Sequence, residues 1–476
     1  MVRRLKKNRI EKDTLGTMPV PARAYYGIQT KRASENFRIS GIRPKQEFIT
    51  ATACVKKAAC LANISLGLLD KKRGRAIIKA CDDIMAGMFN DQFIVDAYQA
   101  GAGTSHNMNA NEVIANRANE LLGGKKGAYA PVHPNDHANM SQSTNDVFPT
   151  AMRLSIVNAS SGLALAMSGL KRALSAKGRE FHKIIKSGRT HLQDAVPVRL
   201  GGEFLSYASS VESSIEKINA AHERLKRIGL GGTAAGTGLN THPAYRKTVL
   251  KELSRVSGLK GLKIAPDPHE ALNSMADFSW FSGALRDTAI ELIRISNDIR
   301  LLSSGPRTGL GELKLPAVQP GSSIMPGKVN PVMAEMLAMV CFQVIGNDLA
   351  VTMAAQAGQL ELNVMGPVIS HNILQSIEIL ANAVNAFTRR CVIGIKADAK
   401  RCAEYLETSA GLATALNRFI GYEKAAEAAY EAVRTGKTIK EITVSKKILT
   451  KKEWARLMAP RNITGPADLK KIKRSA

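Results

Sequence analysis

Long stretches in which apolar residues recur at a helical spacing constrain the fold of this chain more than any other feature. Between residues 203 and 228 the apolar positions lie three, four or seven residues apart, which predicts a long amphipathic helix. Residues 281–302 are apolar on more than one side, as is typical of a helix buried between other helices. Further long helices are predicted at 151–184, 332–355 and 367–395. Together these patterns predict a mostly α fold with a central bundle of long helices.

Changes in sequence texture predict three parts. Residues 1–141 are expected to form a mainly helical N-terminal domain, 142–396 the long-helix bundle, and 397–476 a small C-terminal helical domain. Clusters of glycine and proline separate the predicted helices. Strand patterns are weak, and the clearest are at 24–27 and 259–264.

The charge balance suggests two kinds of partner. Lys and Arg number 67 against 40 Asp and Glu, which gives a formal net charge of +27. Such an excess is typical of nucleic-acid binding, and it also attracts small anionic ligands. Aromatic residues make up only 5% of the chain, so platforms on which bases could stack are scarce. We therefore expect a small anion as the ligand and no specific nucleic acid.

Membrane and metal signals are weak in the sequence. No run approaches the ~18–20 uncharged apolar residues that a membrane helix needs, and no apolar signal-peptide core follows the basic start. The six cysteines are scattered, without C-x-x-C or the Cys/His spacing of a zinc site. The expectation is a cytoplasmic protein with reduced cysteines, no membrane contact and no protein-derived metal site.

Four polar segments are dense in hydroxyl and amide side chains. They are residues 101–109, 133–146, 188–194 and 321–330. Ser, Thr and Asn provide short neutral hydrogen-bond donors, Lys328 provides a positive charge, and glycines let the backbone approach a ligand. This combination suits a small dicarboxylate. Each segment taken alone is equally compatible with ordinary turn and helix-cap chemistry.

The fourth segment carries a specific resemblance. Residues 321–331, Gly-Ser-Ser-Ile-Met-Pro-Gly-Lys-Val-Asn-Pro, are similar to the signature of the aspartase/fumarase superfamily, and the other three segments resemble it in the same order. The similarity extends from residues 25–29 to 465–466. It implies the superfamily's fold, in which two smaller, mainly helical domains flank the central bundle. It also implies a lyase that releases fumarate by trans β-elimination.

Two branches of the superfamily remain in view. Four segments resemble the aspartate ammonia-lyase branch: 101–105, 143–146, 194–197 and 355–365. Residues 133–136 and 309–312 look as much like class II fumarase. The resemblance therefore favours reversible deamination of L-aspartate to fumarate and ammonia, with hydration of fumarate to malate as the alternative. His106, inside the first segment, stands where the family commonly has an apolar residue.

Residue roles follow from the resemblance. It implies that Ser322 is the general base, on a loop that closes over the substrate, and that charge spreads into an aci-carboxylate at the neighbouring carboxyl group. It implies that His191 contacts the leaving amine, with Asn145 beside it. It assigns the β-carboxylate to Thr104, Ser143, Thr144 and Ser323, and the α-carboxylate to Thr190, Lys328 and Asn330. Ser105 is a further candidate for substrate binding.

The resemblance also bears on assembly and cofactors. It implies a homotetramer in which each active site takes segments from three subunits. No organic cofactor is expected. Some aspartases respond to divalent cations, and the sequence contains no ligand cluster that demands one.

Overall fold

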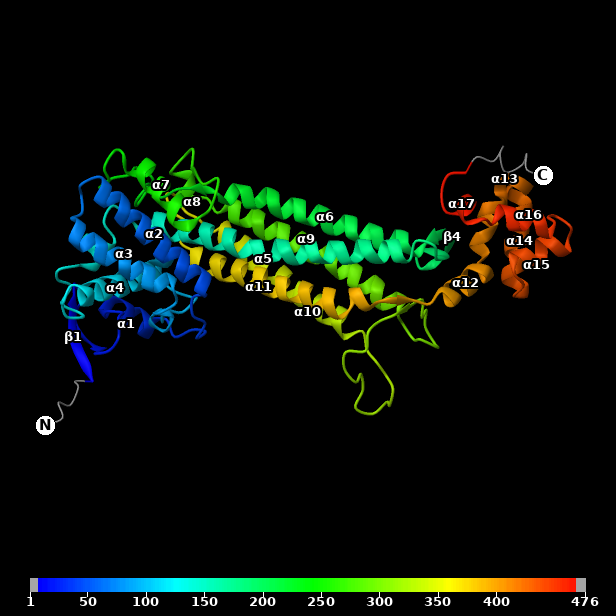
Figure 1. Ribbon diagram of the computed structural model, residues 1–476, viewed down its shortest axis with the longest axis horizontal. Coiled ribbons are helices and arrows are strands. Elements are labelled where there is room, and N and C mark those ends of the chain that lie inside the picture. Colours follow the sequence, from blue (N-terminus) through cyan, green and yellow to red (C-terminus); the bar gives the residue numbers. More distant parts are fainter. Residues whose placement is uncertain (1–6, 468–476) are drawn as a thin grey trace. The chain divides into compact units, whose positions relative to one another are not determined.

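The computed structural model describes residues 7–467, whose contacts form two units. Unit 1 contains the chain up to residue 165 together with 216–289 and 341–381, and unit 2 contains 166–215, 290–340 and the chain from residue 382 onward. Long helices contribute one part to each unit (Figure 1); they are α5 (Thr144–Glu180), α6 (Leu200–Leu225), α9 (Ala276–Leu302), α10 (Val332–Ala355) and α11 (Gly366–Arg390). This division cuts the long helices, so the three-part domain organisation stays a prediction.

The long helices confirm what the apolar periodicity predicts. Helix α10 has the predicted bounds, and the other four begin or end within a few residues of the predicted positions. In unit 1, buried Arg153 of α5 and Arg224 of α6 each bond one oxygen of Asp277 on α9, at 3.0 and 3.1 Å. The single carboxylate of Asp277 thereby links three helices through its two ion pairs.

Helix α10 bears on the expectation of no membrane contact, which stays a prediction. Among the described residues it is the one helix long and apolar enough, by length and composition alone, to cross a membrane, with a mean hydropathy of 1.5. Strict counting of uncharged runs misses it, because Glu335 and Asp348 interrupt the run while the average hydropathy remains high. One such helix is weak evidence for a membrane span, since the helices of a bundle have similar compositions. Only 39% of its most apolar window is buried in the single chain.

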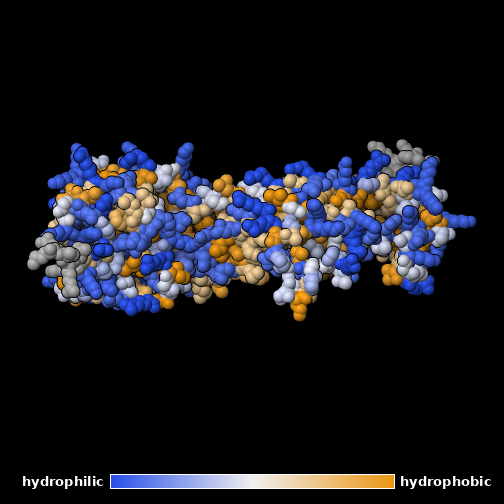
Figure 2. Space-filling view, turned by 60° about the horizontal axis from the view of Figure 1, so that its bottom comes forward, coloured by the Kyte–Doolittle hydropathy of each residue, from blue (hydrophilic) through white to orange (hydrophobic). Residues whose placement is uncertain are grey.

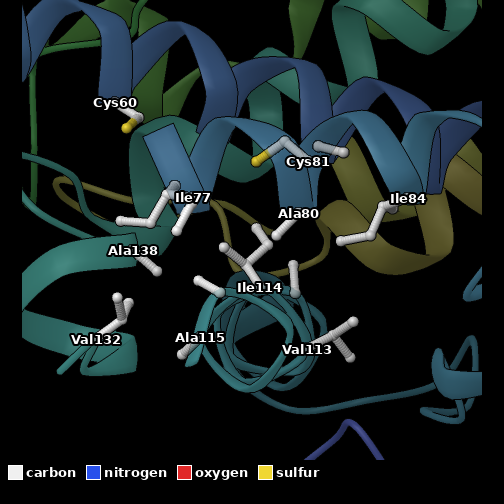
Figure 3. Packing of buried hydrophobic residues seen from close by; sticks show 14 of the residues in the cluster. Cys60, Ile77, Ala80, Cys81, Ile84, Val113, Ile114, Ala115, Val132 and Ala138 are labelled. Carbon is white, nitrogen blue, oxygen red and sulfur yellow. The ribbon is translucent and has the colours of Figure 1, made fainter. Parts of the chain in front are cut away.

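The first core of unit 1 forms where α2 (Gln46–Ser65), α3 (Lys71–Met85) and α4 (Thr104–Leu121) pack together. Figure 3 shows Ile77, Ala80 and Ile84 of α3 directed toward α4, which carries Val113, Ile114 and Ala115. Helix α4 is buried along nearly its whole length. This packing fixes the position of the α4 N-terminus, where Thr104 lies.

The remaining elements of unit 1 are short. They are strands β1 (Asn8–Asp13) and β2 (Gly16–Pro21), which pair antiparallel, helices α1 (Ile28–Asn36), α7 (Tyr245–Ser257) and α8 (Glu270–Asn273), and the parallel pair β5 (Arg227–Ile228) and β6 (Lys263–Ile264). Strand β6 lies inside the predicted strand region 259–264. The strand predicted at 24–27 is wrong: the carbonyl groups of Ala24 and Tyr26 accept hydrogen bonds from the Arg9 guanidinium at 2.7 and 2.8 Å, so this segment curls around Arg9.

Unit 2 contains a hairpin and a small helical cluster besides its share of the bundle. Strands β3 (Ile185–Thr190) and β4 (Gln193–Arg199) pair antiparallel, and β7 (Leu313–Lys314) pairs with β8 (Lys396–Ala397). The helices that follow are α12 (Ala399–Thr408), α13 (Asn417–Ile420), α14 (Tyr422–Thr435), α15 (Ile439–Ser445), α16 (Lys451–Leu457) and α17 (Pro460–Ile463). They share a core around Leu416, Ile439 and Trp454. Capping boxes at Thr438 and Thr450 start α15 and α16.

Candidate active site

The first polar segment lies at the N-terminus of α4. A short turn, Gly101–Gly103, leads into the helix, and Gly103 has a φ of +92°. A Cβ at Gly103 would lie 2.1 Å from the ring of Phe148, so only glycine fits both the conformation and the space. Thr104 is exposed and donates its hydroxyl to the carbonyl of Gly101 at 2.8 Å, whereas Ser105 is buried.

The second segment caps α5. Asn145 donates its backbone N–H to Ser143 Oγ at 3.2 Å, and Ser143 donates its own N–H to Asp146 Oδ1 at 3.0 Å. The other oxygen of Asp146 accepts the N–H groups of Gly231 and Thr233. Burial raises the pKa of Asp146 to about 6. The N-terminus of α5, with its partial positive charge, therefore presents Ser143, Thr144 and Asn145 at a position that favours a carboxylate.

A buried amide network supports Thr144 from behind. Asn107 on α4 donates to Thr144 Oγ1 at 3.1 Å and to Asn139 Oδ1 at 3.2 Å. The same Asn139 oxygen accepts from Asn111 at 3.1 Å and from Lys56 Nζ at 2.8 Å. Burial lowers the pKa of Lys56 to about 7. The sequence analysis missed this network; its only local signal is the pair of asparagines one helical turn apart on α4.

A cleft opens where this network ends. It has a volume of about 490 Å³, and its lining includes Ser143, Thr144, Asn107 and Asn139. Hydroxyl and amide groups therefore face the space, with Lys56 behind them. A cleft of this size and chemistry accommodates a small dicarboxylate with room for water.

The third segment is the turn of the β3–β4 hairpin. Thr190 pairs with Gln193 across a two-residue turn made of His191 and Leu192, whose φ values are +55° and +58°. Positive φ at both central positions defines a type I′ turn, which normally takes Asn-Gly. Neither residue here is glycine or asparagine, so the turn stores about 1–2 kcal/mol of backbone strain per residue. It presents His191 to solvent, and such strained positions concentrate at functional sites.

The signature loop folds back on itself. Gly321 donates its N–H to the carbonyl of Lys328 at 2.9 Å, and Asn330 donates its side-chain N–H to the carbonyl of Gly321 at 2.6 Å. A Cβ at Gly321 would lie 2.3 Å from that Lys328 oxygen, so the closure requires glycine. Ser322 Oγ accepts two backbone N–H groups, from Ile324 at 3.2 Å and from Met325 at 2.8 Å.

The loop is otherwise detached. Residues 323–329 are exposed, and hydrophobic residues mark its tip in Figure 2. Within the described part of the chain, no hydrogen bond joins 321–330 to any other segment of unit 2. The loop therefore places Ser322 and Lys328 near each other, and within the described residues no hydrogen bond joins them to the β3–β4 hairpin.

The candidate residues divide between the units. Unit 1 brings together the N-termini of α4 and α5, through the bond from Asn107 to Thr144. These termini carry Thr104, Ser105, Ser143, Thr144 and Asn145. Unit 2 holds Thr190 and His191 on one element and Ser322, Ser323, Lys328 and Asn330 on another. The roles assigned to these residues stay predictions.

His106 is not available to a ligand. Its ring is buried among Phe48, Phe93 and Phe148, with ring centroids 4.7–6.0 Å apart. Nε2 lies 2.9 Å from the hydroxyl of Thr52, which itself donates to a carbonyl, so Nε2 is the protonated nitrogen. Burial lowers the pKa of His106 to about 3, so the ring stays neutral. Its departure from the usual apolar residue changes the core rather than the ligand.

Metal binding finds no support in side-chain clustering. Among residues 7–467, no group of three or more His, Cys, Asp or Glu side chains is placed to hold a metal ion.

The mostly α fold, the capped helix termini and the serine loop define a class: enzymes of the fumarate lyase type. Comparison with known proteins agrees. The family model described as "Lyase" matches residues 16–346, and one described as "Fumarase C C-terminus" matches 412–465. The chain belongs to this lyase family, and the predicted fold class and superfamily are confirmed.

Individual members of the family are similar to the chain over nearly its whole length. The chain is 49% identical over 461 residues to an aspartate ammonia-lyase of Bacillus subtilis, covering 97% of each chain. It is 46% identical over 459 residues to a class II fumarate hydratase of Neisseria meningitidis, covering 96% of this chain and 99% of that one. A solved structure of a fumarate lyase:delta crystallin from Brucella melitensis, bound to cobalt, superposes with a TM-score of 0.94 at 49% identity, covering 96% of this chain and all of that one.

Proposed function

We propose that the enzyme catalyses the reversible deamination of L-aspartate to fumarate and ammonia. The observation that carries the proposal is the environment of Ser322. Its Oγ accepts two backbone N–H groups on the signature loop, with Lys328 on the same loop. A serine hydroxyl is ordinarily a poor base, and donors preorganised around its oxygen stabilise the alkoxide that must form.

The proposed chemistry runs in two steps. The Ser322 alkoxide removes a proton from C3 of aspartate, and the electron pair moves into the β-carboxylate as an aci-carboxylate. That pair then returns to form the C2–C3 double bond as the C–N bond breaks and the amine leaves with its electrons. Donors at the β-carboxylate lower the barrier because the negative charge grows there during the first step.

Substrate binding is proposed to use segments from more than one subunit. Thr104, Ser143, Thr144 and Ser323 would hold the β-carboxylate, while Thr190, Lys328 and Asn330 would hold the α-carboxylate. Asn145 and His191 would contact the amino group. The N-terminus of α5 and the buried Lys56 favour a carboxylate at Thr144. The +27 charge of the chain would speed the encounter with a dianion.

Class II fumarase is the alternative. Its support is the 46% identity to a fumarate hydratase, close to the 49% shared with an aspartate ammonia-lyase. Residues 101–105, 143–146, 194–197 and 355–365 favour aspartate. In the alternative reaction water replaces ammonia, and proton delivery by His191 becomes more important.

The deciding experiment follows the absorbance of fumarate formed from aspartate and from malate by the same preparation. We expect turnover of aspartate and little of malate. Strong turnover of malate with none of aspartate would establish the alternative. Turnover of neither, by a folded protein, would contradict both. Repeating the assay after treatment with a chelator tests whether a divalent cation activates the enzyme.

A homotetramer with active sites built from three subunits is part of the proposal. Its support is a stripe on α10 made of Met339, Phe342, Leu349 and Met353, each 56–64% exposed in the single chain. Their spacing of three, seven and four residues places them on one side of the helix, in the pattern of a helix-packing seam. Hydrophobic residues also gather on the side that Figure 2 presents. A stripe of this kind is typically covered by another subunit.

Charge on this stripe tests the assembly. The double substitution Phe342→Glu with Leu349→Glu should convert the tetramer to smaller, inactive species in light scattering, because carboxylates would be buried without partners. Glutamate at exposed Leu165, outside the stripe, is the control and should leave the tetramer intact. A fully active tetramer in the double variant would contradict the proposed interface.

A further inference from the structure

A fully buried carboxylate lies beneath the hairpin that carries Thr190 and His191. Glu312 has no exposed surface, and it bonds two cations of strand β3. Its Oε2 lies 3.1 Å from Lys186 Nζ and 3.1 Å from Arg189 Nη1, and its Oε1 lies 2.9 Å from Arg189 Nη2. Lys186 also bonds Glu203 at 3.0 Å. Two positive and two negative groups thus balance within unit 2.

Glu312 is itself fixed to two other elements. Its backbone N–H donates to the carbonyl of Leu302 at the end of α9, and its carbonyl accepts from Asp398 before α12, both at 2.9 Å. It directly precedes β7, and the chain from β7 leads to the signature loop. The carboxylate therefore connects strand β3 to the base of the segment that carries Ser322 and Lys328.

The hairpin has little else to hold its turn. Among the described residues, the side chains of Thr190 and His191 have no hydrogen-bond partner, and both are exposed. Strand β3 packs against α12 and strand β4 against residues 410–416, but the turn itself contains two strained residues. The register of β3 shifts between Ser187 and Arg189, which brings Arg189 to the two-pronged contact next to the turn. The guanidinium of Arg189 also lies over the ring of Tyr405, 5.5 Å from its centroid.

We propose that Glu312 is a positioning residue, whose carboxylate holds Arg189 and thereby sets Thr190 and His191 in place for the substrate. This rests on the proposed function, in which these two residues contact the α-carboxylate and the amino group. Glu312 touches no reacting atom. Its action passes through the backbone of Arg189 and Thr190, which are neighbours in the chain.

The test compares two substitutions in the complete enzyme. Glu312→Gln removes the charge, and Arg189→Lys keeps the charge but cannot form the two-pronged contact. We expect each variant to raise the KM for the substrate about tenfold or more, with a smaller change in kcat, because a displacement of about 1 Å in a positioning group weakens binding strongly. We also expect faster hydrogen–deuterium exchange in residues 185–199.

A matched control breaks a different buried ion pair, one that lies in unit 1 and not in the hairpin's unit. Asp277→Asn breaks the pair with Arg153 in unit 1 and should destabilise the protein without changing KM or exchange in the hairpin. If Glu312→Gln does not fold, the KM and the hydrogen–deuterium exchange of Arg189→Lys alone test the role of Glu312. The double variant Arg189→Gln with Glu312→Gln should be no worse than the single Glu312→Gln, since both partners of one contact are removed.

The outcomes separate this inference from the proposed function. Unchanged exchange in 185–199 and unchanged KM in a folded variant would overturn the role of Glu312. If the enzyme turns over malate and not aspartate, and the variants show faster exchange and a raised KM for malate, the role of Glu312 is supported while aspartate is rejected as the substrate. Loss of activity in proportion to the loss of folded tetramer, with a normal KM in the remainder, would show a purely structural role and overturn the inference.

Discussion

Two of the candidate ligand segments in this enzyme are built in opposite ways. At the N-terminus of α5, Thr144 is supported by Asn107, which is bonded to Asn139 inside a buried network. Among residues 7–467, the signature loop with Ser322 forms hydrogen bonds only within itself, and it is largely exposed. A rigid site binds without reorganisation, whereas a separate loop can admit the substrate and then exclude water. Under the proposed function, the α5 terminus is a preorganised binding site, whereas the signature loop carries the reactive group and closes over the substrate.

Among the tests of this contrast, the substitution Ser322→Ala should have the largest effect. If the loop delivers the base, kcat should fall about 100- to 10,000-fold, since this is the usual contribution of a positioned general base. Steady-state kinetics measures the loss, and light scattering measures assembly. Assembly should be unchanged, because the hydrogen bonds of this hydroxyl to described residues lie within an exposed loop.

The control for Ser322→Ala is Ser323→Ala on the same loop. It removes a predicted contact to the β-carboxylate but not the base, so its kcat should fall far less. Near-normal turnover in Ser322→Ala would reject the base assignment, and equal losses in both variants would indicate that the loop only closes the site.

Lys328→Ala should have the next largest effect. The substitution removes a charged partner of the α-carboxylate, so kcat/KM should fall roughly 10- to 100-fold, from a charged hydrogen bond of about 1.5–3 kcal/mol. The inhibition constant of succinate, a dicarboxylate without the amine, should rise in parallel. Unchanged affinity for succinate would show that Lys328 does not hold a carboxylate.

How much of the fold and of the candidate site the sequence could predict depends on how far apart in the sequence the interacting residues lie. The long helices were predictable because their periodicity is local. The four polar segments stand out in the sequence because their composition is unusual, and their role in ligand binding stays a prediction. The β3–β4 hairpin was not, since its strands lack alternation and its turn is His191-Leu192 rather than Asn-Gly. The bond from Lys56 to Asn139 joins residues that are 83 positions apart in the sequence, and no local sequence pattern predicts such a contact. In the sequence, nothing distinguishes Glu312 from the other acidic residues, because its burial is apparent only in the folded structure.

A smaller effect is expected from Asn107→Ala in the rigid site. Loss of its bond to Thr144 should raise KM about 2- to 10-fold with little change in kcat, the range of a neutral hydrogen bond. Asn111→Ala is the matched control, because Asn111 bonds the same oxygen of Asn139 but not Thr144. Both variants should lose similar stability in urea unfolding, and only the first should bind substrate more weakly. Equal KM values in the two variants would show that the network supports the fold and not the ligand.

His106→Leu should affect activity least, within about twofold, because its ring faces the aromatic core and not the cleft. Its effect on stability should depend on pH. The folded pKa of His106 is about 3, below the ordinary value of 6.5, so the unfolded chain takes up the proton first. Stability from this residue is therefore complete above pH 6.5 and is lost as pH falls toward 3. Between pH 7 and 5 the wild type should lose about 2 kcal/mol per protomer that the leucine variant retains. Urea unfolding of both proteins at equal concentration measures the difference. An equal loss in both would mean that His106 is protonated in the folded enzyme, and a charged ring beside Thr104 and Ser105 would then belong to the ligand site rather than to the core.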